Sequence, residues 1–341
     1  MRLTKLEGPS VWRSEEFAGQ EDWCQRLTEP ELTEIMAAVR HCQSRGTPLF
    51  EIGRDEFPLD RLARRFERIR GELEGGRGFT VLRGLDPASL DPEACKLVIW
   101  GLAQYLGTPE PQDRSGSLLH SVTNTGKTIA NSDTARGYET DDELKFHNDG
   151  GDVFMLLCLR TAKEGGVSKL VSAGALFNAI LQERPDLAAV LQQPFYFDSR
   201  AQNLNEKKVQ VVPVFTEHMG YLNVLYKRRY IVTAQRFEDV PRLTPEQVEA
   251  LDIFDRLCAD PALQLSFSMQ PGDIQIGNNY SILHARTKYV DYDDPQRRRH
   301  LYRLWLTLEN SRPLPEVFGT TREFGPSYAR RQQRAQANME Q

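Results

Sequence analysis

The chain has 341 residues, enough for one large domain or two ordinary ones, and its 40% hydrophobic and 27% charged residues are typical of a globular protein. The formal net charge of −5 argues against a nucleic-acid-binding protein, which would more often carry a basic balance. Residues 1–19 lack the apolar core of a signal peptide, and the longest apolar run, Val153–Leu159, is too short to span a bilayer.

Five cysteines are scattered along the chain without a C-x-x-C pair. This spacing predicts reduced thiols in a cytoplasmic protein rather than a disulfide framework or a thiolate zinc site. Cys158 lies inside the apolar run and is interpreted as a small core residue. The sequence thus predicts neither a nucleic-acid nor a membrane partner, and it leaves the formation of a homo-oligomer open.

Residues 1–107 are predicted to be mostly helical. The tetrapeptide T-E-P-E at 28–31 matches a capping box, and apolar residues at helical spacing follow it as far as Val39. A second helix is predicted from about Pro58 to Leu73, where two glycines stop it, and a short strand follows at 78–82. A third helix is predicted to open at Asp91-Pro92 and to close at Gly107.

The character of the sequence changes after Gly107. Residues 109–140 are polar with little periodicity, and a loop of this length is usually functional or disordered. From Leu144 onward short strand-like runs dominate: 153–159, 167–172, 195–198, 209–215, 221–225, 263–269, 274–276 and 301–308, with helices at 175–184 and 245–259. This pattern predicts a mainly β fold, a sandwich or jelly roll closed by N-terminal and inserted helices.

No linker divides the chain, so residues 1–341 are expected to form a single domain with its β core at 144–310. The tail at 325–341 is rich in Arg and Gln and is interpreted as a solvated helix or a disordered end.

The run K-F-H-N-D-G-G at 145–151 contains a candidate pair of metal ligands. On a strand, His147 and Asp149 would face the same side and reach one ion. With 6 histidines and 48 acidic residues in the chain, one such pattern is expected about once by chance. A surface histidine beside an aspartate is therefore the alternative, and Gly150-Gly151 indicates a bulge.

A second histidine lies far downstream. The run P-G-D at 271–273 is read as a turn entering a strand that leads to L-H-A-R at 283–286, which places His284 near a strand end. Two histidines and one carboxylate are the ligand set of non-haem Fe(II) oxygenases, although the same donors also suit Mn, Ni or Zn. The remaining histidines are interpreted as structural.

Two arginines are candidates for binding a dicarboxylate. Arg299 and Arg303 are four residues apart, so on a strand they would share a face, and a guanidinium holds a carboxylate with two hydrogen bonds. Arg303 is embedded in an apolar strand, where a cation is costly unless it is paired. Ser168, in G-G-V-S, offers a hydroxyl to the same group. For Arg297 and Arg298, a basic loop in solvent is the alternative.

The order of these motifs resembles a known family. H-x-D, then G-G-x-S, then L-H-A-R and P-Q-R-R-R-H-L-Y-R resemble the TauD/TfdA-like and clavaminate-synthase-like Fe(II)/2-oxoglutarate dioxygenases over Phe146–Leu308. The resemblance implies a double-stranded β-helix (jelly roll) core that uses Fe(II), 2-oxoglutarate and O2. It makes His147, Asp149 and His284 the iron ligands.

The resemblance also implies roles for the hydroxyl and the arginines. Arg303 would hold the distal carboxylate of 2-oxoglutarate with help from Ser168, which stands where the family usually has threonine. Arg299 would lie near the carboxylate bound at the metal. The stretch from His284 to these arginines is longer than in relatives, which keeps Arg298 as an alternative.

The implied activity is oxidation, first of all hydroxylation, of an unactivated C–H bond in a small polar metabolite such as an amino acid or natural-product intermediate, with release of succinate and CO2. Desaturation or ring closure is the alternative outcome, and a Zn or Mn jelly-roll enzyme is the rival activity. A jelly-roll binding protein without turnover ranks last. The resemblance also implies a lid at 131–143, where Asn131, Arg136 and Tyr138 are candidate substrate contacts. Arg286 would either face the pocket or hold the loop.

Overall fold

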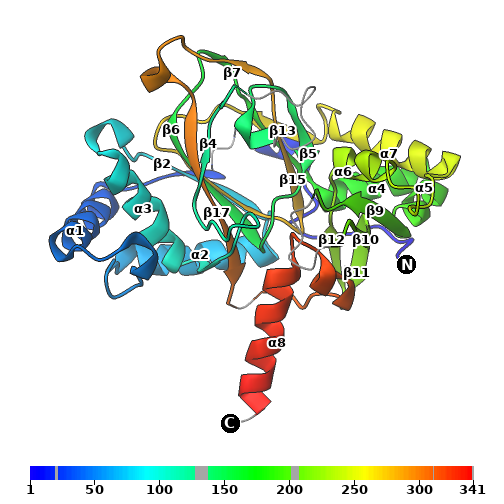
Figure 1. The fold of residues 1–341 in the computed structure, drawn as a ribbon, viewed down its shortest axis with the longest axis horizontal. Helices are drawn as coiled ribbons and strands as arrows, with labels where there is room; N and C mark the ends of the chain where they lie inside the picture. Colours follow the sequence, from blue (N-terminus) through cyan, green and yellow to red (C-terminus); the bar gives the residue numbers. More distant parts are fainter. Residues whose placement is uncertain (20–21, 127–136, 201–206, 310, 340–341) are drawn as a thin grey trace.

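Two β-sheets face each other at the centre of the molecule, and helices cover their outer faces (Figure 1). The structure is a computed structural model that describes residues 1–19, 22–126, 137–200, 207–309 and 311–339. Aromatic and aliphatic side chains from both sheets meet between them, among them Phe154 and Trp305 from one sheet and Leu170 and Ile282 from the other. The space between the sheets therefore holds part of the core.

The larger sheet has the strand order β1-β2-β14-β6-β17-β3, with β4 also paired to β17. Its strands are β1 (Cys24–Arg26), β2 (Phe79–Arg83), β3 (Gly107–Pro109), β4 (His120–Val122), β6 (Val153–Arg160), β14 (Ile274–Asn278) and β17 (His300–Leu308). Alternate residues of β6 serve two cores, because Met155 packs toward the helices and Phe154 toward the other sheet. Burial on both faces explains why β6 and β17 appear as nearly continuous apolar runs in the sequence.

The smaller sheet has the order β13-β8-β15-β5. These strands are β13 (Gln264–Phe267), β8 (Ser168–Ser172), β15 (Ile282–Arg286) and β5 (Leu144–His147). Along the chain, β5 lies in the smaller sheet, β6 in the larger, β8 and β13 in the smaller, β14 in the larger, β15 in the smaller and β17 in the larger. This alternation between facing sheets is the jelly-roll arrangement that the sequence predicted.

Three two-stranded ribbons complete the β structure. They are β7 (Glu164–Gly165) with β16 (Tyr289–Val290), β9 (Pro194–Asp198) with β10 (Val209–Pro213), and β11 (Phe215–His218) with β12 (Tyr221–Val224). The prediction of one strand over 209–215 is wrong, because the chain changes partner at Val214. Its carbonyl accepts from Leu225, and the next N–H, on Phe215, donates to Leu191.

Helices α1 (Glu29–Arg45), α2 (Arg61–Gly75) and α3 (Pro92–Gln104) cover the outer face of the larger sheet (Figure 1). The capping box at the start of α1 is confirmed. Helix α2 begins three residues after the predicted start because Glu34 of α1 caps it from outside. Its carboxylate accepts the backbone N–H groups of residues 60, 61 and 62. Strands β1 to β4 all precede residue 144 and belong to the larger sheet, so this sheet extends beyond residues 144–310.

Helices α4 (Ala173–Glu183), α5 (Pro185–Val190) and α7 (Pro245–Cys258) pack with ribbons β9–β12 against the outer face of the smaller sheet, and α6 (Arg228–Ala234) packs on β9. The sequence predicted α4 and α7 but neither α5 nor α6. Short 3₁₀ helices lie at η1 (Ser14–Phe17), η2 (Leu49–Glu51), η3 (Pro87–Ser89), η4 (Gly137–Glu139), η5 (Pro295–Arg297) and η6 (Glu316–Thr320). Within the described residues, no helix is both long enough and apolar enough to cross a bilayer.

All five cysteines are free thiols, as their spacing predicted. Burial raises the pKa of Cys158 to about 12, and its side chain packs between the sheets beside Leu301. Cys158 is therefore a core residue without nucleophilic character.

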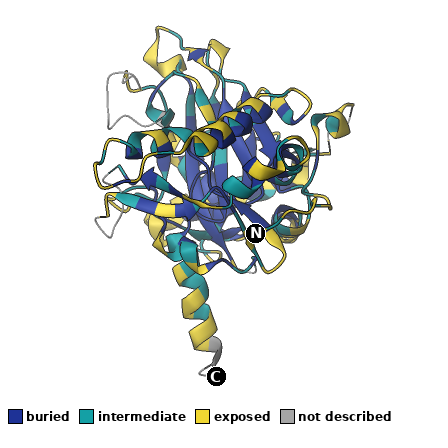
Figure 2. Cartoon of the chain, turned by 90° about the vertical axis from the view of Figure 1, so that its right-hand side faces the viewer, coloured by how far each residue is buried: buried dark blue, intermediate teal, exposed yellow. Residues whose placement is uncertain are grey.

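The C-terminal segment forms helix α8 (Gly325–Met339), which projects away from the body of the molecule and is exposed along much of its length (Figures 1 and 2). Its base is anchored by Arg331, whose guanidinium lies 3.0 Å from the fully buried carboxylate of Asp152. Asp152 also accepts from the Tyr280 hydroxyl at 2.5 Å and from the backbone of Leu308 at 2.8 Å. The tail therefore helps to hold the turn between β5 and β6.

Candidate metal centre

Three of the predicted ligands come together between the two sheets. His147 ends β5 and is the cross-strand partner of His284 on β15. The two ring centroids are 4.3 Å apart, and Nε2 of His284 is 3.7 Å from the carboxylate of Asp149. One donor atom from each of the three residues lies within 4.8 Å of the other two, which is close enough for all three to reach a single ion.

The prediction that His147 and Asp149 share one face of a strand is wrong. Strand β5 ends at His147, and Asp149 lies in the turn that leads to β6. The carboxylate reaches the histidines because the chain turns sharply at Gly150-Gly151, where Gly151 has φ +72°. The turn, and not the alternation of side chains along a strand, therefore brings the Asp149 carboxylate to the two histidines.

Two buried asparagines hold this turn in place. Asn148 donates to the carbonyls of Asn279 and Ile282 at 2.6 and 3.1 Å, and its own carbonyl accepts from the backbone of Tyr226 at 2.8 Å. Asn279 accepts from the backbone N–H of Asp149 at 3.1 Å and donates to the carbonyl of Gly150 at 2.8 Å. The backbone that carries Asp149 is therefore fixed from both sides.

The protonation states of the triad suit metal binding. Nδ1–H of His147 donates to the Lys145 carbonyl at 2.8 Å, which leaves the Nε2 lone pair available. Burial lowers the pKa of His147 to about 4 and holds the pKa of His284 well below its ordinary value. Burial raises the pKa of Asp149, but Arg303 and the two imidazoles outweigh it and hold that pKa below its usual range. At neutral pH the site thus offers two neutral imidazoles and one carboxylate.

We predict that Gly151→Ala destabilises the protein by more than the cost of a left-handed alanine, which is about 1–3 kcal/mol. A Cβ at Gly151 would lie 2.8 Å from the backbone oxygen of Leu306 on β17, so the turn must move. The measurement is the free energy of unfolding in urea. Gly116→Ala is the matched control, because Gly116 has φ +80° but open space around it. Equal losses in the two variants would contradict the close approach of the turn to β17.

An inner cavity lies on one side of the triad and is lined by Ser168, Arg286 and Arg299. Ser168 and Arg286 are cross-strand partners on β8 and β15. The guanidinium of Arg299 is buried, and its Nη1 has no hydrogen-bond partner among the described residues. Among the described residues, neither Arg286 nor Arg299 forms an ion pair with a carboxylate. Burial and the neighbouring Arg299 lower the pKa of Arg286 to about 10. Two close cations and a hydroxyl make this cavity suitable for a carboxylate ligand.

Arg303 also lines the inner cavity but has a carboxylate partner. Its Nη1 donates to both oxygens of Asp149 at 3.0 and 3.2 Å, and its Nε donates to the side-chain oxygen of Gln112 at 2.7 Å. The expectation that Arg299 and Arg303 reach the same space holds, since both line this cavity. Their surroundings differ, because Arg303 is hydrogen-bonded to a triad residue and Arg299 is not.

A larger outer cavity of about 400 Å³ opens on the other side of His147 and Asp149. Among the residues that line it are Lys227, Tyr230, Trp305 and Arg322. None of these four residues, nor Gln112, was predicted from the sequence as part of the site. The signals present in the sequence are weak: Lys227 begins the basic run K-R-R directly after an apolar strand, and Arg322 lies in an otherwise unremarked C-terminal segment.

The predicted substrate contacts fall in different places. Asn131 and Arg136 lie outside the described residues, and so does the side chain of Tyr138. Arg286 faces the inner cavity, and it also holds the preceding loop by donating to the carbonyls of Thr140 and Asp142. Arg286 therefore both faces the pocket and holds the loop, the two roles that the sequence left as alternatives.

The sequence pattern of the taurine catabolism dioxygenase TauD, TfdA family matches residues 44–305. The chain is 31% identical over 324 residues to FR-33289 synthase of Streptomyces rubellomurinus (strain ATCC 31215), covering 93% of this chain and 94% of that protein.

Two solved structures share the fold. An asparagine oxygenase in complex with Fe(II), 2S,3S-3-hydroxyasparagine and succinate superimposes with a TM-score of 0.65 at 19% identity, covering 84% of this chain and 93% of that one. The non-heme iron oxygenase OrfP in complex with Fe and alpha-ketoglutaric acid gives a TM-score of 0.61 at 15% identity, covering 83% of this chain and 94% of that one.

Proposed function

Because the chain belongs to the TauD, TfdA family and is an Fe(II)- and 2-oxoglutarate-dependent oxygenase, we propose that His147, Asp149 and His284 hold its iron. The observation that carries this proposal is the convergence of one donor atom from each residue within 4.8 Å. The fit is supported by the donor set, since two neutral imidazoles and one carboxylate suit Fe(II) and leave positions open for other ligands.

We further propose that Arg299, assisted by Ser168 and Arg286, binds the distal carboxylate of 2-oxoglutarate. This exchanges the roles that the sequence suggested for Arg299 and Arg303. Arg299 is buried with Nη1 unpartnered among the described residues, so it needs an anion, whereas Arg303 already has Asp149. Arg303 then acts as a positioning residue that orients the ligand carboxylate.

Fe(II), 2-oxoglutarate and O2 together supply the oxidising chemistry when bound, with succinate and CO2 as co-products. The chain itself orients the groups. The turn at 148–152 fixes Asp149, and the contact with the Lys145 carbonyl would leave Nε2 of His147 to bind the metal. The outer cavity would hold the substrate beside it. We propose hydroxylation of a small polar metabolite, which a cavity of about 400 Å³ lined by both polar and apolar side chains would accept.

A Zn or Mn enzyme of another class has no use for the cations of the inner cavity, and the family assignment rules it out. A binding protein without turnover is disfavoured for the same reason. The cytoplasmic location stays a prediction of the sequence, and the formation of a homo-oligomer stays open, as the sequence left it.

The proposed function is tested by succinate formation. Protein supplied with Fe(II), 2-oxoglutarate and O2 is expected to produce succinate, and a screen of amino acids, small peptides, sulfonates and phosphonates should include compounds that raise the rate. Replacing Fe(II) by Zn(II), or removing O2, should abolish the product. Succinate formation that is indifferent to metal and O2, or its complete absence across the screen, would contradict the assignment.

A further inference from the structure

One aromatic ring lies against both arginines that line the inner cavity beside Ser168. The ring centroid of Tyr289 is 4.5 Å from the guanidinium carbon of Arg286 and 5.2 Å from that of Arg299. Tyr289 is only 1% exposed, so both contacts are shielded from water. The face of an aromatic ring carries partial negative charge and attracts a cation, and this attraction is stronger where water is excluded. The ring of Tyr289 therefore stabilises two buried like charges at once.

The segment that carries Tyr289 is bound to the G-G-V-S run at 165–168. Tyr289 on β16 is the cross-strand partner of Gly165 on β7, and a Cβ at Gly165 would clash with the backbone of β16 and the residue before it. Glycine is therefore required for the two strands to come so close. Next to this pair, the N–H of Val167 donates to the Thr287 hydroxyl and the N–H of Thr287 donates to the Val167 carbonyl, both at 3.0 Å. The ring and Ser168 are thus carried by one connected unit.

The two arginines are held in different ways. Arg286 donates to the backbone carbonyls of Thr140 and Asp142, so its guanidinium is fixed by hydrogen bonds. The guanidinium of Arg299 is buried and donates no hydrogen bond to a described residue, so its contact with Tyr289 takes the place of such bonds. Without the ring, repulsion from Arg286 would drive the Arg299 side chain away, because like charges repel strongly where water is excluded. The ring of Tyr289 therefore keeps the two guanidiniums together.

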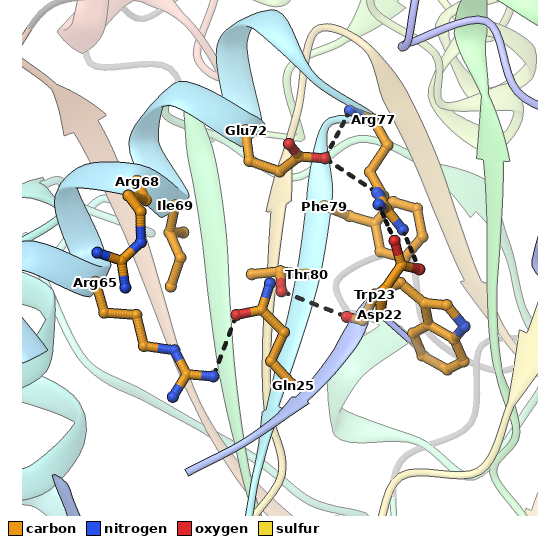
Figure 3. Close-up of a pocket in the computed structure, with 10 residues that line it drawn as sticks. All are labelled: Asp22, Trp23, Gln25, Arg65, Arg68, Ile69, Glu72, Arg77, Phe79 and Thr80. Carbon is orange, nitrogen blue, oxygen red and sulfur yellow. Dashed lines mark hydrogen bonds and ion pairs between the residues drawn. The ribbon is translucent and has the colours of Figure 1, made fainter. Parts of the chain in front are cut away.

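The cavity near α2 shows another way of holding a guanidinium (Figure 3). There Nη1 and Nη2 of Arg77 donate to the carboxylate of Asp22 at 2.9 and 2.7 Å, and its Nε donates to Glu72 at 3.0 Å. Carboxylates accept the N–H groups of the arginine that they hold. A ring attracts the cation but leaves those N–H groups to a ligand. The contact with Tyr289 therefore suits an arginine that has to bind a carboxylate.

We propose that Tyr289 is a positioning residue for 2-oxoglutarate, because its ring holds Arg299 beside Arg286 before the co-substrate binds. Both guanidiniums are then already in place for the distal carboxylate. An arginine without such a contact would have to give up the freedom of its side chain on binding, and the ring removes that cost in advance. This inference rests on the proposed function, since it requires 2-oxoglutarate to bind in the inner cavity.

The test is an anaerobic titration of the Fe(II)-loaded enzyme with 2-oxoglutarate, which measures affinity without turnover. Tyr289→Leu is expected to weaken 2-oxoglutarate binding by about tenfold, the effect of leaving one arginine side chain free to move. Tyr289→Phe keeps the ring and should bind 2-oxoglutarate as the wild type does, because the Tyr289 hydroxyl has no hydrogen-bond partner among the described residues. In both variants the Fe(II) affinity, and the kcat at saturating 2-oxoglutarate, should stay close to those of the wild type.

A series of fluorinated rings separates the charge of the ring face from its shape. Mono-, di- and trifluorinated phenylalanine at position 289 keep the shape of the ring while they remove the negative charge of its face step by step. The affinity for 2-oxoglutarate is expected to fall along this series relative to Tyr289→Phe. Because the packing around the ring is preserved, the series also decides the question if Tyr289→Leu does not fold.

The matched control is Tyr292→Leu. The ring of Tyr292 lies 3.9 Å from the guanidinium of Arg297, and Tyr292 lines neither the inner nor the outer cavity, so its replacement should leave 2-oxoglutarate binding unchanged. Failure of the wild type to bind 2-oxoglutarate would contradict the proposed function itself. Equal affinity along the fluorinated series, or a Tyr289→Phe variant that binds as weakly as Tyr289→Leu, would overturn only the inference.

Discussion

Replacing Arg299 with methionine is expected to raise the KM for 2-oxoglutarate by about 100-fold, which corresponds to the loss of about 3 kcal/mol when one partner of a buried charge pair is removed. The physical reason is that the guanidinium is buried, lies in the cavity with Ser168 and Arg286, and has Nη1 unpartnered among the described residues. Methionine fills much of the same volume but offers no donor.

The measurement is initial-rate kinetics of succinate formation with 2-oxoglutarate varied. Arg298→Met is the matched control, because the neighbouring guanidinium donates to the loop carbonyls of Tyr292 and Asp293 and not into the cavity. Its KM should stay close to that of the wild type. Arg303→Met should instead weaken Fe(II) binding by about 10–100-fold, the usual cost of losing a group that orients a metal ligand.

These variants separate two assignments. If Arg303→Met raises the KM for 2-oxoglutarate by about 100-fold while Arg299→Met leaves it unchanged, the roles that the sequence suggested are right and the exchange proposed from the structure is wrong.

Replacing His284 with glutamine is expected to lower Fe(II) affinity by more than about 100-fold, since losing a ligand should cost more than losing an orienting partner. Succinate formation should fall to background at Fe(II) concentrations that saturate the wild type. His284 is buried against the ring of Phe154, with centroids 4.3 Å apart, and glutamine keeps a polar side chain of similar size there. Unfolding measurements on the same sample separate loss of metal from loss of fold.

The control for this variant is His218→Gln. His218 lies at the end of ribbon strand β11, away from both cavities, and its replacement should leave Fe(II) affinity and succinate formation unchanged. Normal Fe(II) binding by a folded His284→Gln protein would contradict the assignment of His284 as a ligand.

Local patterns in the sequence were sufficient for much of the fold. The capping box at Thr28 and the apolar spacing after it predicted α1, and the succession of short apolar runs predicted two packed sheets. Predictions of element boundaries failed where the hydrogen-bond partners of a segment lie far away in the sequence. Helix α2 starts late because Glu34 of another helix caps it, and the run at 209–215 divides because Leu225 and Leu191 take its hydrogen bonds.

In the candidate site, too, the residues with a local sequence pattern were predicted, and the contacts between distant segments were not. Residue types and order sufficed to single out His147, Asp149, His284 and Ser168 as candidates, and the structure places all four around the inner cavity. The surroundings of the two arginines could not be foreseen, because Arg303 meets Asp149 across 154 positions of sequence, and no local pattern reports that contact. Nor could the outer cavity be foreseen, since Lys227 and Arg322 are brought together only by the packing of the C-terminal segment against the sheets.

The iron site is tested most directly by anaerobic titration of the protein with Fe(II), followed by 2-oxoglutarate, while the visible spectrum is recorded. One Fe(II) is expected to bind per chain, and addition of 2-oxoglutarate is expected to produce the weak visible absorption band typical of this family. Neither should be seen in His284→Gln. A wild-type protein that stays colourless, or a variant that develops the same band, would contradict the claim that His147, Asp149 and His284 form the metal centre.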